Sequence, residues 1–155
     1  MTVQIISFRP EYAPEFRDLN IEWLESYFHV EPHDAALLDA CEEVIIKQGG
    51  YIFFALVEGV IVGTYAFMKI SKGIYELGKM AVKPNYRGMK VGQKLMEHAI
   101  LFAKKEQWQK IILYSNTILE NAIYIYRKYG FEEVKLEKNE PYKRSNIKME
   151  LNITQ

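Results

Sequence analysis

The stretch from Lys83 to Ile100, KPNYRGMKVGQKLMEHAI, places two glycines around a basic residue directly before an amphipathic helix pattern. A helix N-terminus leaves backbone N–H groups unpaired and carries a partial positive charge, so it can bind phosphate. Gly88 and Gly92 would let the backbone approach such a ligand closely. The pattern predicts an anion-binding turn, although a plain loop with solvated lysines would use similar residues.

The distribution of charge favours the anion-binding interpretation. Between Glu76 and Glu97 every charged side chain is basic, namely Lys79, Lys83, Arg87, Lys90 and Lys94. The whole chain carries 20 basic and 20 acidic residues, so its net charge is zero. Such a balance does not indicate a nucleic-acid or membrane partner, and the basic stretch predicts a local site instead.

Two common phosphate-binding motifs do not fit this turn. The mononucleotide loop requires GxxxxGK followed by Ser or Thr, but Gly88 and Gly92 are one residue too close and Gln93 follows them. The dinucleotide pattern GxGxxG also fails, because no third glycine completes it. Coenzyme A remains as a phosphate carrier that the turn could hold.

Hydrophobic periodicity predicts the elements that must position this turn. The first half of the chain is typical of a strand, two helices and three neighbouring strands. A strand is predicted over 3–8, and a helix follows Pro10 and Pro14, with Phe16, Leu19, Trp23 and Tyr27 on one face. A short helix over 33–42 comes next. A hairpin over 51–70, which turns at Glu58 and Gly59, and a strand over 74–82 complete this half. Residues 44–50 fit either a helix end or a loop.

The second half alternates helices and strands. A helix from Val91 to about Gln107 and a strand over 110–115 complete a strand–helix–strand unit, which requires a parallel strand pair. A last helix over 119–129 should end at Gly130, and strands over 131–136 and 145–151 follow. This order predicts one α/β (α+β) domain over residues 1–155, with a mixed sheet flanked by helices.

The segments ELGKMAVKPNYRGMKVGQKLMEHAI and AIYIYRKYGF resemble the GNAT superfamily of N-acetyltransferases, and the resemblance extends over most of the chain. In that family a strand of the form [ML]-A-V-x-P-x-Y-R-G leads into the pyrophosphate loop [RQ]-x-x-G-x-[GA]. The chain is also similar to a bacterial-type subgroup of this family. Members of the subgroup are either free-standing domains or domains fused to transcription regulators. The resemblance implies a mostly antiparallel sheet whose parallel βαβ unit forms an acyl-CoA cleft.

The resemblance also implies how the co-substrate acetyl-CoA would be held. The backbone of residues 80–82 should pair with the pantetheine arm like an added strand, and the amides of residues 88–93 should hold the pyrophosphate. Lys90 stands where the family usually has glycine, so its φ must suit a residue with a Cβ, and its ammonium should reinforce phosphate binding. The expected cofactor-binding residues are Met80, Ala81, Val82, Arg87, Gly88, Met89, Lys90, Val91, Gly92, Gln93 and Asn116.

Two residues are candidates for proton transfer in such a reaction. An amine arrives mostly as ammonium and must lose a proton before it attacks a thioester. Glu76 matches the acidic position that many family members use as base, although it could also be a solvent-facing strand residue. Tyr126 matches the tyrosine of the family pattern Y-x-K-x-G-F, and its hydroxyl could protonate the departing thiolate, although a tyrosine on such a stripe is often core. We expect the amine to attack the thioester directly, in a ternary complex with acetyl-CoA.

Other positions have less certain roles. Leu119 occupies a position where many members have asparagine, and Asn116 or Asn121 could supply the amide or only cap the helix; we favour Asn116 for the amide. Glu31 and Asp34 could line a pocket for a cationic amine, or they could form a helix start with first-turn acids, which we favour. Tyr142 and Arg144 could border the acceptor pocket.

The cysteine and histidine content and the lack of a long apolar segment limit the kinds of protein that this sequence indicates. Cys41 is the only cysteine and fits a buried apolar position, so we expect neither a disulfide nor an acetyl-cysteine intermediate. The three histidines lack metal-ligand spacing, so we expect no metal. No signal peptide or membrane span is apparent, which favours a cytoplasmic protein. We expect a small-molecule or protein amine as acceptor and a possible homodimer; the alternative is a non-catalytic CoA or acyl-CoA sensor.

Overall fold

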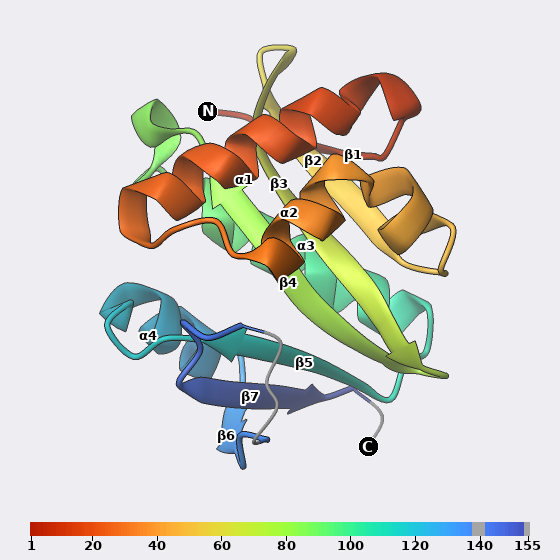
Figure 1. Cartoon of the computed structure of the whole chain (residues 1–155), viewed down its shortest axis with the longest axis vertical. Coiled ribbons are helices and arrows are strands. Elements are labelled where there is room, and N and C mark those ends of the chain that lie inside the picture. Colours follow the sequence, from red (N-terminus) through yellow and green to blue (C-terminus); the bar gives the residue numbers. More distant parts are fainter. Residues whose placement is uncertain (138–141, 154–155) are drawn as a thin grey trace.

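The computed structural model describes residues 1–137 and 142–153, which form a seven-stranded sheet with helices on both faces (Figure 1). The strand order is β1-β2-β3-β4-β5-β7-β6, and only the pair β4 and β5 is parallel. The strands are β1 (Gln4–Ser7), β2 (Tyr51–Val57), β3 (Val60–Ser71), β4 (Ile74–Val82), β5 (Lys110–Ser115), β6 (Glu132–Val134) and β7 (Ile147–Asn152). The predicted mixed, mostly antiparallel sheet is confirmed.

The helices divide between the two faces of this sheet. They are α1 (Ala13–Tyr27), α2 (Pro32–Asp39), α3 (Val91–Lys105) and α4 (Glu120–Lys128), with short helical turns η1 (Pro10–Tyr12), η2 (Glu42–Ile46) and η3 (Pro84–Tyr86). Strand β2 is buried on both sides, because Phe54 packs in the core cluster of α1 and α2 while Phe53 packs in the cluster of α3. Two apolar cores therefore hold the helices on opposite faces of one sheet.

Strand β4 changes its pairing along its length. It pairs with β5 only from Ile74 to Glu76, and beyond that point the two strands diverge, as Figure 1 shows. On its other edge, β3 pairs Ala66 with Gly78 and Thr64 with Ala81, so β4 contains one extra residue there. Lys79 has a φ of 51° at this β-bulge. Past Glu76, the edge of β4 that faces β5 is left without a strand partner among the described residues.

Most of the predicted turns and ends are confirmed. Glu58 and Gly59 both have positive φ and form the two-residue turn of the β2–β3 hairpin. Gly130 has a φ of 99°, and the Phe131 amide donates to the Tyr126 carbonyl at 3.0 Å, which is the predicted left-handed end of the last helix. Cys41 is buried, as expected.

Several boundaries differ from the prediction. Strand β6 covers Glu132–Val134 instead of 131–136, and β7 covers Ile147–Asn152 instead of 145–151. The second helix ends at Asp39 rather than at residue 42, because Ala40 leaves the helical conformation, with φ −136° and ψ 43°. The ambiguous segment that follows begins as a π-helical turn, η2, and not as a loop. These corrections do not change the order of the elements.

Candidate active site

A long groove of about 670 Å³ runs between the end of β4, the start of α3 and the start of α4. Met80, Ala81 and Val82 line it, and their strand is paired with β3 on one side only. The free edge therefore presents backbone groups to the groove, where an extended ligand could pair like an added strand. This arrangement agrees with the expected pantetheine contact of the three residues.

The turn before α3 forms one end of the long groove. Gly88, Lys90, Val91, Gly92 and Gln93 all line it. The first intrahelical bond is from the Lys94 amide to the Lys90 carbonyl at 3.0 Å, so the three amides of residues 91–93 have no partner within the helix, and no side chain caps it. Their position suits an anionic group, as the sequence predicts.

Two residues of this turn differ from expectation. Lys90 has φ 64° and ψ 16°, the left-handed conformation that favours glycine, so the prediction that its φ suits a side chain is wrong. Met89 is 52% exposed and does not line the groove, and its amide donates to the Tyr86 carbonyl at 3.3 Å. Met89 is therefore not placed to bind the ligand through its amide.

Arg87 lines the groove, but two nitrogens of its guanidinium donate hydrogen bonds to other groups of the protein. Its Nε donates to the Val82 carbonyl at 3.0 Å, and its Nη2 forms an ion pair with Glu22 of α1. The guanidinium also lies 5.4 Å from the centre of the Tyr27 ring. Arg87 therefore ties the turn to α1.

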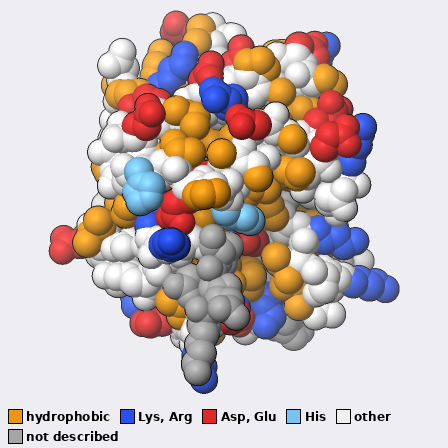
Figure 2. Space-filling view, in the orientation of Figure 1, with side chains coloured by type: hydrophobic (Ala, Val, Ile, Leu, Met, Phe, Trp, Pro, Cys, Tyr) orange, Lys and Arg blue, Asp and Glu red, His pale blue; other side chains and the backbone are white. Residues whose placement is uncertain are grey.

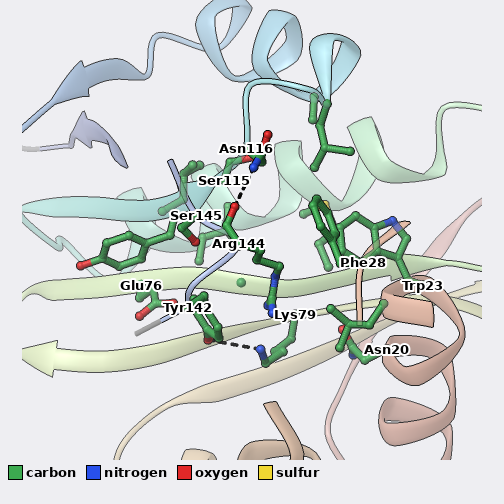
Figure 3. A pocket seen from close by; sticks show the side chains of 18 of the residues that line it. Asn20, Trp23, Phe28, Glu76, Lys79, Ser115, Asn116, Tyr142, Arg144 and Ser145 are labelled. Atoms are coloured by element: carbon green, nitrogen blue, oxygen red, sulfur yellow. Dashed lines mark hydrogen bonds between the residues drawn. The ribbon is translucent and has the colours of Figure 1, made fainter. Parts of the chain in front are cut away.

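An inner cavity of about 120 Å³ opens where β4 and β5 diverge, and Figure 3 shows the side chains that line it. Asn20, Trp23 and Phe28 approach from α1 and its C-terminal end, opposite Glu76 and Tyr142. The inner cavity and the long groove share a set of lining residues: Trp23, Met80, Met96, Leu119, Ala122 and Tyr126. The two spaces therefore meet at these residues.

Glu76 lies on the wall of the inner cavity and is 8% exposed. Burial raises the pKa of Glu76 to about 7, although the positive charges of Lys79, Lys148 and Arg144 lower it in part. The alternative of a solvent-facing strand residue is wrong. A carboxylate with this pKa can accept a proton near neutral pH.

Tyr126 lies at the junction of the two spaces. Its ring packs against Phe131 with the ring centres 6.0 Å apart, so part of the residue does contribute to the core. Burial raises the pKa of Tyr126, and a hydrogen bond with the Ser115 side chain lowers it in part. The hydroxyl therefore keeps its proton at neutral pH and can act as a donor at this junction.

A buried charge network forms the floor behind the inner cavity. Asp34 accepts hydrogen bonds from Lys79 Nζ at 2.6 Å and from both terminal nitrogens of Arg144, at 2.7 and 2.9 Å. Glu31 accepts from Arg144 Nη1 at 3.2 Å and from the Lys143 amide at 2.9 Å. Burial alone would raise the pKa of Asp34, but Arg144 and Lys79 lower it to about 2. The network is therefore charged and internally paired.

The roles of the two acids are settled by this network. Glu31 and Asp34 form a capping box at the start of α2, which confirms the predicted helix start. Neither residue lines the inner cavity, so their alternative role as the wall of an amine pocket is wrong. Tyr142 and Arg144 do line it, as expected for residues that border an acceptor pocket.

Lys79 is the residue whose position sequence reasoning missed. Its place in the basic stretch suggested the anion-binding turn, yet its ammonium bonds to Asp34 and to the Tyr142 hydroxyl, 3.2 Å away. Strict strand alternation would put residues 76 and 79 on opposite faces, and the extra residue of the bulge brings both to the inner cavity. A lysine in a strand whose other charged residue is Glu76 was the available signal.

Asn116 also lies away from its predicted place. It lines the inner cavity and not the long groove. Its Nδ2 donates to the Arg144 carbonyl at 2.7 Å, and its Oδ1 accepts from the Ile118 amide at 2.9 Å. The side chain therefore holds the turn before α4 and the segment that carries Arg144, because both ends of its amide are engaged.

Surface charge, metal-ligand clusters and membrane spans are further features that would indicate a ligand or partner. Acidic and basic side chains are interspersed on the face shown in Figure 2. Within residues 1–137 and 142–153, no group of three His, Cys, Asp or Glu side chains could hold a metal ion. No helix among these residues is both long and apolar enough to cross a membrane.

Comparison with solved structures shows that the fold is shared by acetyltransferases. The chain superposes on a GNAT-family acetyltransferase from Staphylococcus aureus with a TM-score of 0.86, at 24% identity, covering 99% of this chain and 100% of the other. It also matches the PaiA N-acetyltransferase from Thermoplasma acidophilum, solved in complex with coenzyme A, with a TM-score of 0.77 at 18% identity and coverage of 98% and 99%.

Sequence comparison gives the family. An N-acetylaspartate synthetase from Xenopus tropicalis is 30% identical over 95 residues, which is 60% of this chain and 35% of that protein. The chain spans only 28% and 35% of the length of two curated relatives that it matches. The model of the acetyltransferase (GNAT) domain matches residues 48–133, more than half of the chain. The chain therefore belongs to the GNAT acetyltransferase family.

Proposed function

We propose that this protein transfers the acetyl group of acetyl-CoA to a primary amine by direct attack in a ternary complex. The observation that carries the proposal is the meeting of the long groove with the inner cavity at Met80 and Tyr126. A thioester at this junction would have its CoA arm in the groove and its acetyl group facing the cavity. The amine would then approach from the side of Glu76.

The long groove supplies the features that a CoA arm requires. The free edge of Met80–Val82 can hydrogen-bond to the amides of pantetheine, and the unpaired amides at the start of α3 can hold the pyrophosphate. A neighbour of the same fold from Thermoplasma acidophilum was solved in complex with coenzyme A, which supports CoA as the ligand of this chain. We assign the phosphate contacts to Gly88, Lys90 and the amides of 91–93.

Glu76 is the general base in this proposal. An alkyl ammonium has a reference pKa of about 10.4, so a base must remove its proton before attack. The pKa of Glu76, raised to about 7 by burial, makes its carboxylate a stronger base than an exposed one while leaving much of it ionised at neutral pH. The proton moves from the amine nitrogen to Glu76, directly or through water, as the nitrogen attacks the thioester carbon.

Tyr126 is the acid toward the departing thiolate. Because burial raises the pKa of Tyr126 and a free thiol has a pKa of about 8.5, complete proton transfer from the phenol is uphill. The hydroxyl therefore acts mainly by donating a hydrogen bond to sulfur as negative charge develops there. As the C–S bond breaks, the phenolic proton passes to the thiolate late in the step, and the Tyr126 phenolate regains a proton from solvent. This role requires the hydroxyl at the junction of groove and cavity.

Thiol release from acetyl-CoA, measured against a broad panel of amines beside calorimetric titration of CoA, tests the proposal. We expect CoA to bind and release to depend on the acceptor. Tyr126→Phe should lower kcat, and Tyr124→Phe is a matched control because Tyr124 is 67% exposed on the same helix. Binding without release on any amine would favour the CoA-sensor alternative, and absence of binding would contradict both.

The finer aspects of function stay predictions. We propose that the protein works in the cytoplasm, without nucleic acid or membrane as partner, and that it forms a homodimer. Gel filtration with light scattering tests the oligomeric state.

A further inference from the structure

The inner cavity has an uneven distribution of charge on its wall. Lys79 and Arg144 line it, and Glu76 is the acidic residue among its described lining residues. The carboxylates that neutralise the two cations, Asp34 and Glu31, lie behind them and do not reach the cavity. Figure 3 shows Lys79 and Arg144 between Glu76 and the aromatic side chains of α1. A bound molecule therefore meets cations at the wall before it meets their counter-ions.

Arg144 retains hydrogen-bonding capacity toward this space. A guanidinium carries five N–H donors, and the side-chain bonds of Arg144 to carboxylates use its two terminal nitrogens. Within the described residues, Nε donates no hydrogen bond. The Arg144 side chain is 15% exposed, and its hydrogen bonds and ion pair with Asp34 raise its pKa against the effect of burial, so the group is charged. Because Asp34 and Glu31 already occupy the fork of the two terminal nitrogens, the free donors lie on the edge formed by Nε and Nη2, and a carboxylate is the partner that such an edge binds best.

The dimensions of the cavity limit what can enter it. Its volume of about 120 Å³ is below the range of about 300–1,000 Å³ that holds drug-sized ligands. Trp23, Leu24 and Phe28 give it one apolar side, which could take a short side chain. A small molecule with an amine, a carboxylate and little else fits these limits.

We propose that the acceptor is a small amino acid, a molecule that carries a carboxylate next to its primary amine, with Arg144 binding the carboxylate and Glu76 facing the amine. This inference rests on the proposed acetyl transfer and adds the class of acceptor. Arg144 and Glu76 both line this cavity of about 120 Å³, so one small molecule can contact both.

The same charges disfavour other amine acceptors. A polyamine has no carboxylate to offer, so it would leave the free donors of the Arg144 guanidinium without an anion. The N-terminus of a protein presents an amide carbonyl where a free amino acid presents a carboxylate, so it would leave Arg144 without its anion. Acceptors of these two classes should therefore be poor.

The first test compares matched acceptors with the wild-type protein. A small amino acid, its amide and its decarboxylated amine are assayed for thiol release from acetyl-CoA at one pH. We expect kcat/KM for the amino acid to exceed that for the other two by roughly tenfold or more. The amine of an amino-acid amide is less basic than that of the acid, so a larger fraction of it is unprotonated at the pH of the assay. Intrinsic reactivity alone would therefore favour the amide over the acid.

The outcomes separate the two proposals. Equal or better use of the amide and the decarboxylated amine would overturn the amino-acid inference and leave acetyl transfer intact. Release with none of these three acceptors, but with another amine of the broad panel, would overturn only the amino-acid inference. Release with no amine of the panel, despite binding of CoA, would overturn both.

A variant supplies the second test. Arg144→Lys keeps the charge and removes the planar fork, so it should lower the ratio of kcat/KM for acid over amide by roughly tenfold. Arg144 also pairs with Asp34, so the variant could contain less folded protein. The ratio of the two kcat/KM values does not depend on the folded fraction, because both values fall by the same factor. Arg127→Lys is the control, since Arg127 is exposed on α4, and its ratio should not change. An unchanged ratio in Arg144→Lys would contradict the assignment.

Discussion

Replacing Glu76 with glutamine should make the protein more stable above neutral pH while removing most of its activity. Burial raises the pKa of Glu76 from an ordinary value of 4.5 to about 7. At about 1.4 kcal/mol per pKa unit, this shift corresponds to about 3 kcal/mol of unfolding free energy. Glutamine has nearly the same shape and carries no charge, so it avoids the cost of burying an anion.

The direction of the pH effect follows from proton binding. Between pH 4.5 and 7 the folded state holds the Glu76 proton more tightly than the unfolded state does, so the free energy of unfolding falls as pH rises through this window. Asp34 does not interfere, because its pKa of about 2 places its effect below the window. His33 and His98 have lowered pKa values and act in the opposite direction, so the variant must be compared with the wild type at each pH.

Urea unfolding at pH 5 and pH 8 measures this difference. We expect Glu76→Gln to be more stable than the wild type by about 3 kcal/mol at pH 8 and by less than about 1 kcal/mol at pH 5. Glu132→Gln, at an exposed position of β6, is the control and should show no such pH dependence. The same difference at both pH values would refute the reasoning that Glu76 is buried with a raised pKa.

The kinetic part of the prediction uses the same variant. In the wild type, kcat/KM should rise about tenfold per pH unit below pH 7 as Glu76 ionises and then level off. Glu76→Gln should lower kcat/KM by roughly 10²–10⁴-fold and lose the rise in kcat/KM below pH 7, which is the acidic limb of the pH profile. Retention of the limb in the variant would assign the base to another group.

Three further predictions follow from the site. Tyr126→Phe should lower kcat by roughly tenfold or more with little change in the KM for acetyl-CoA, because the hydroxyl acts on sulfur as the C–S bond breaks. Steady-state kinetics measures both constants, and an unchanged kcat would refute the role of Tyr126. Lys90→Gly should raise stability by about 1 kcal/mol in urea unfolding, because residue 90 has a φ of 64°, and should weaken CoA binding by titration; lower stability would contradict the strain. Glu22→Gln breaks the ion pair to Arg87 and should raise the KM for acetyl-CoA, while an unaltered KM would mean that this tie does not position the turn.

The sequence by itself determined the order of the elements and the location of the turn that we propose binds CoA. Those conclusions depend on local features, namely hydrophobic periodicity, glycines at turns and a basic stretch at a helix start, and local features persist in any fold that the chain adopts. The capping box of α2 and the left-handed end of α4 at Gly130 were predictable for the same reason.

Only the tertiary structure decided which side chains meet. Lys79 reaches the inner cavity because of a β-bulge, and a one-residue shift in strand register has no signal in the sequence. Its partner Asp34 lies 45 residues away, and Arg144 lies 110 residues from Asp34, so their pairing depends on the packing of α2 and of the segment before β7 against β4. The pKa of Glu76 was equally hidden, because it arises from burial between elements that are distant in sequence.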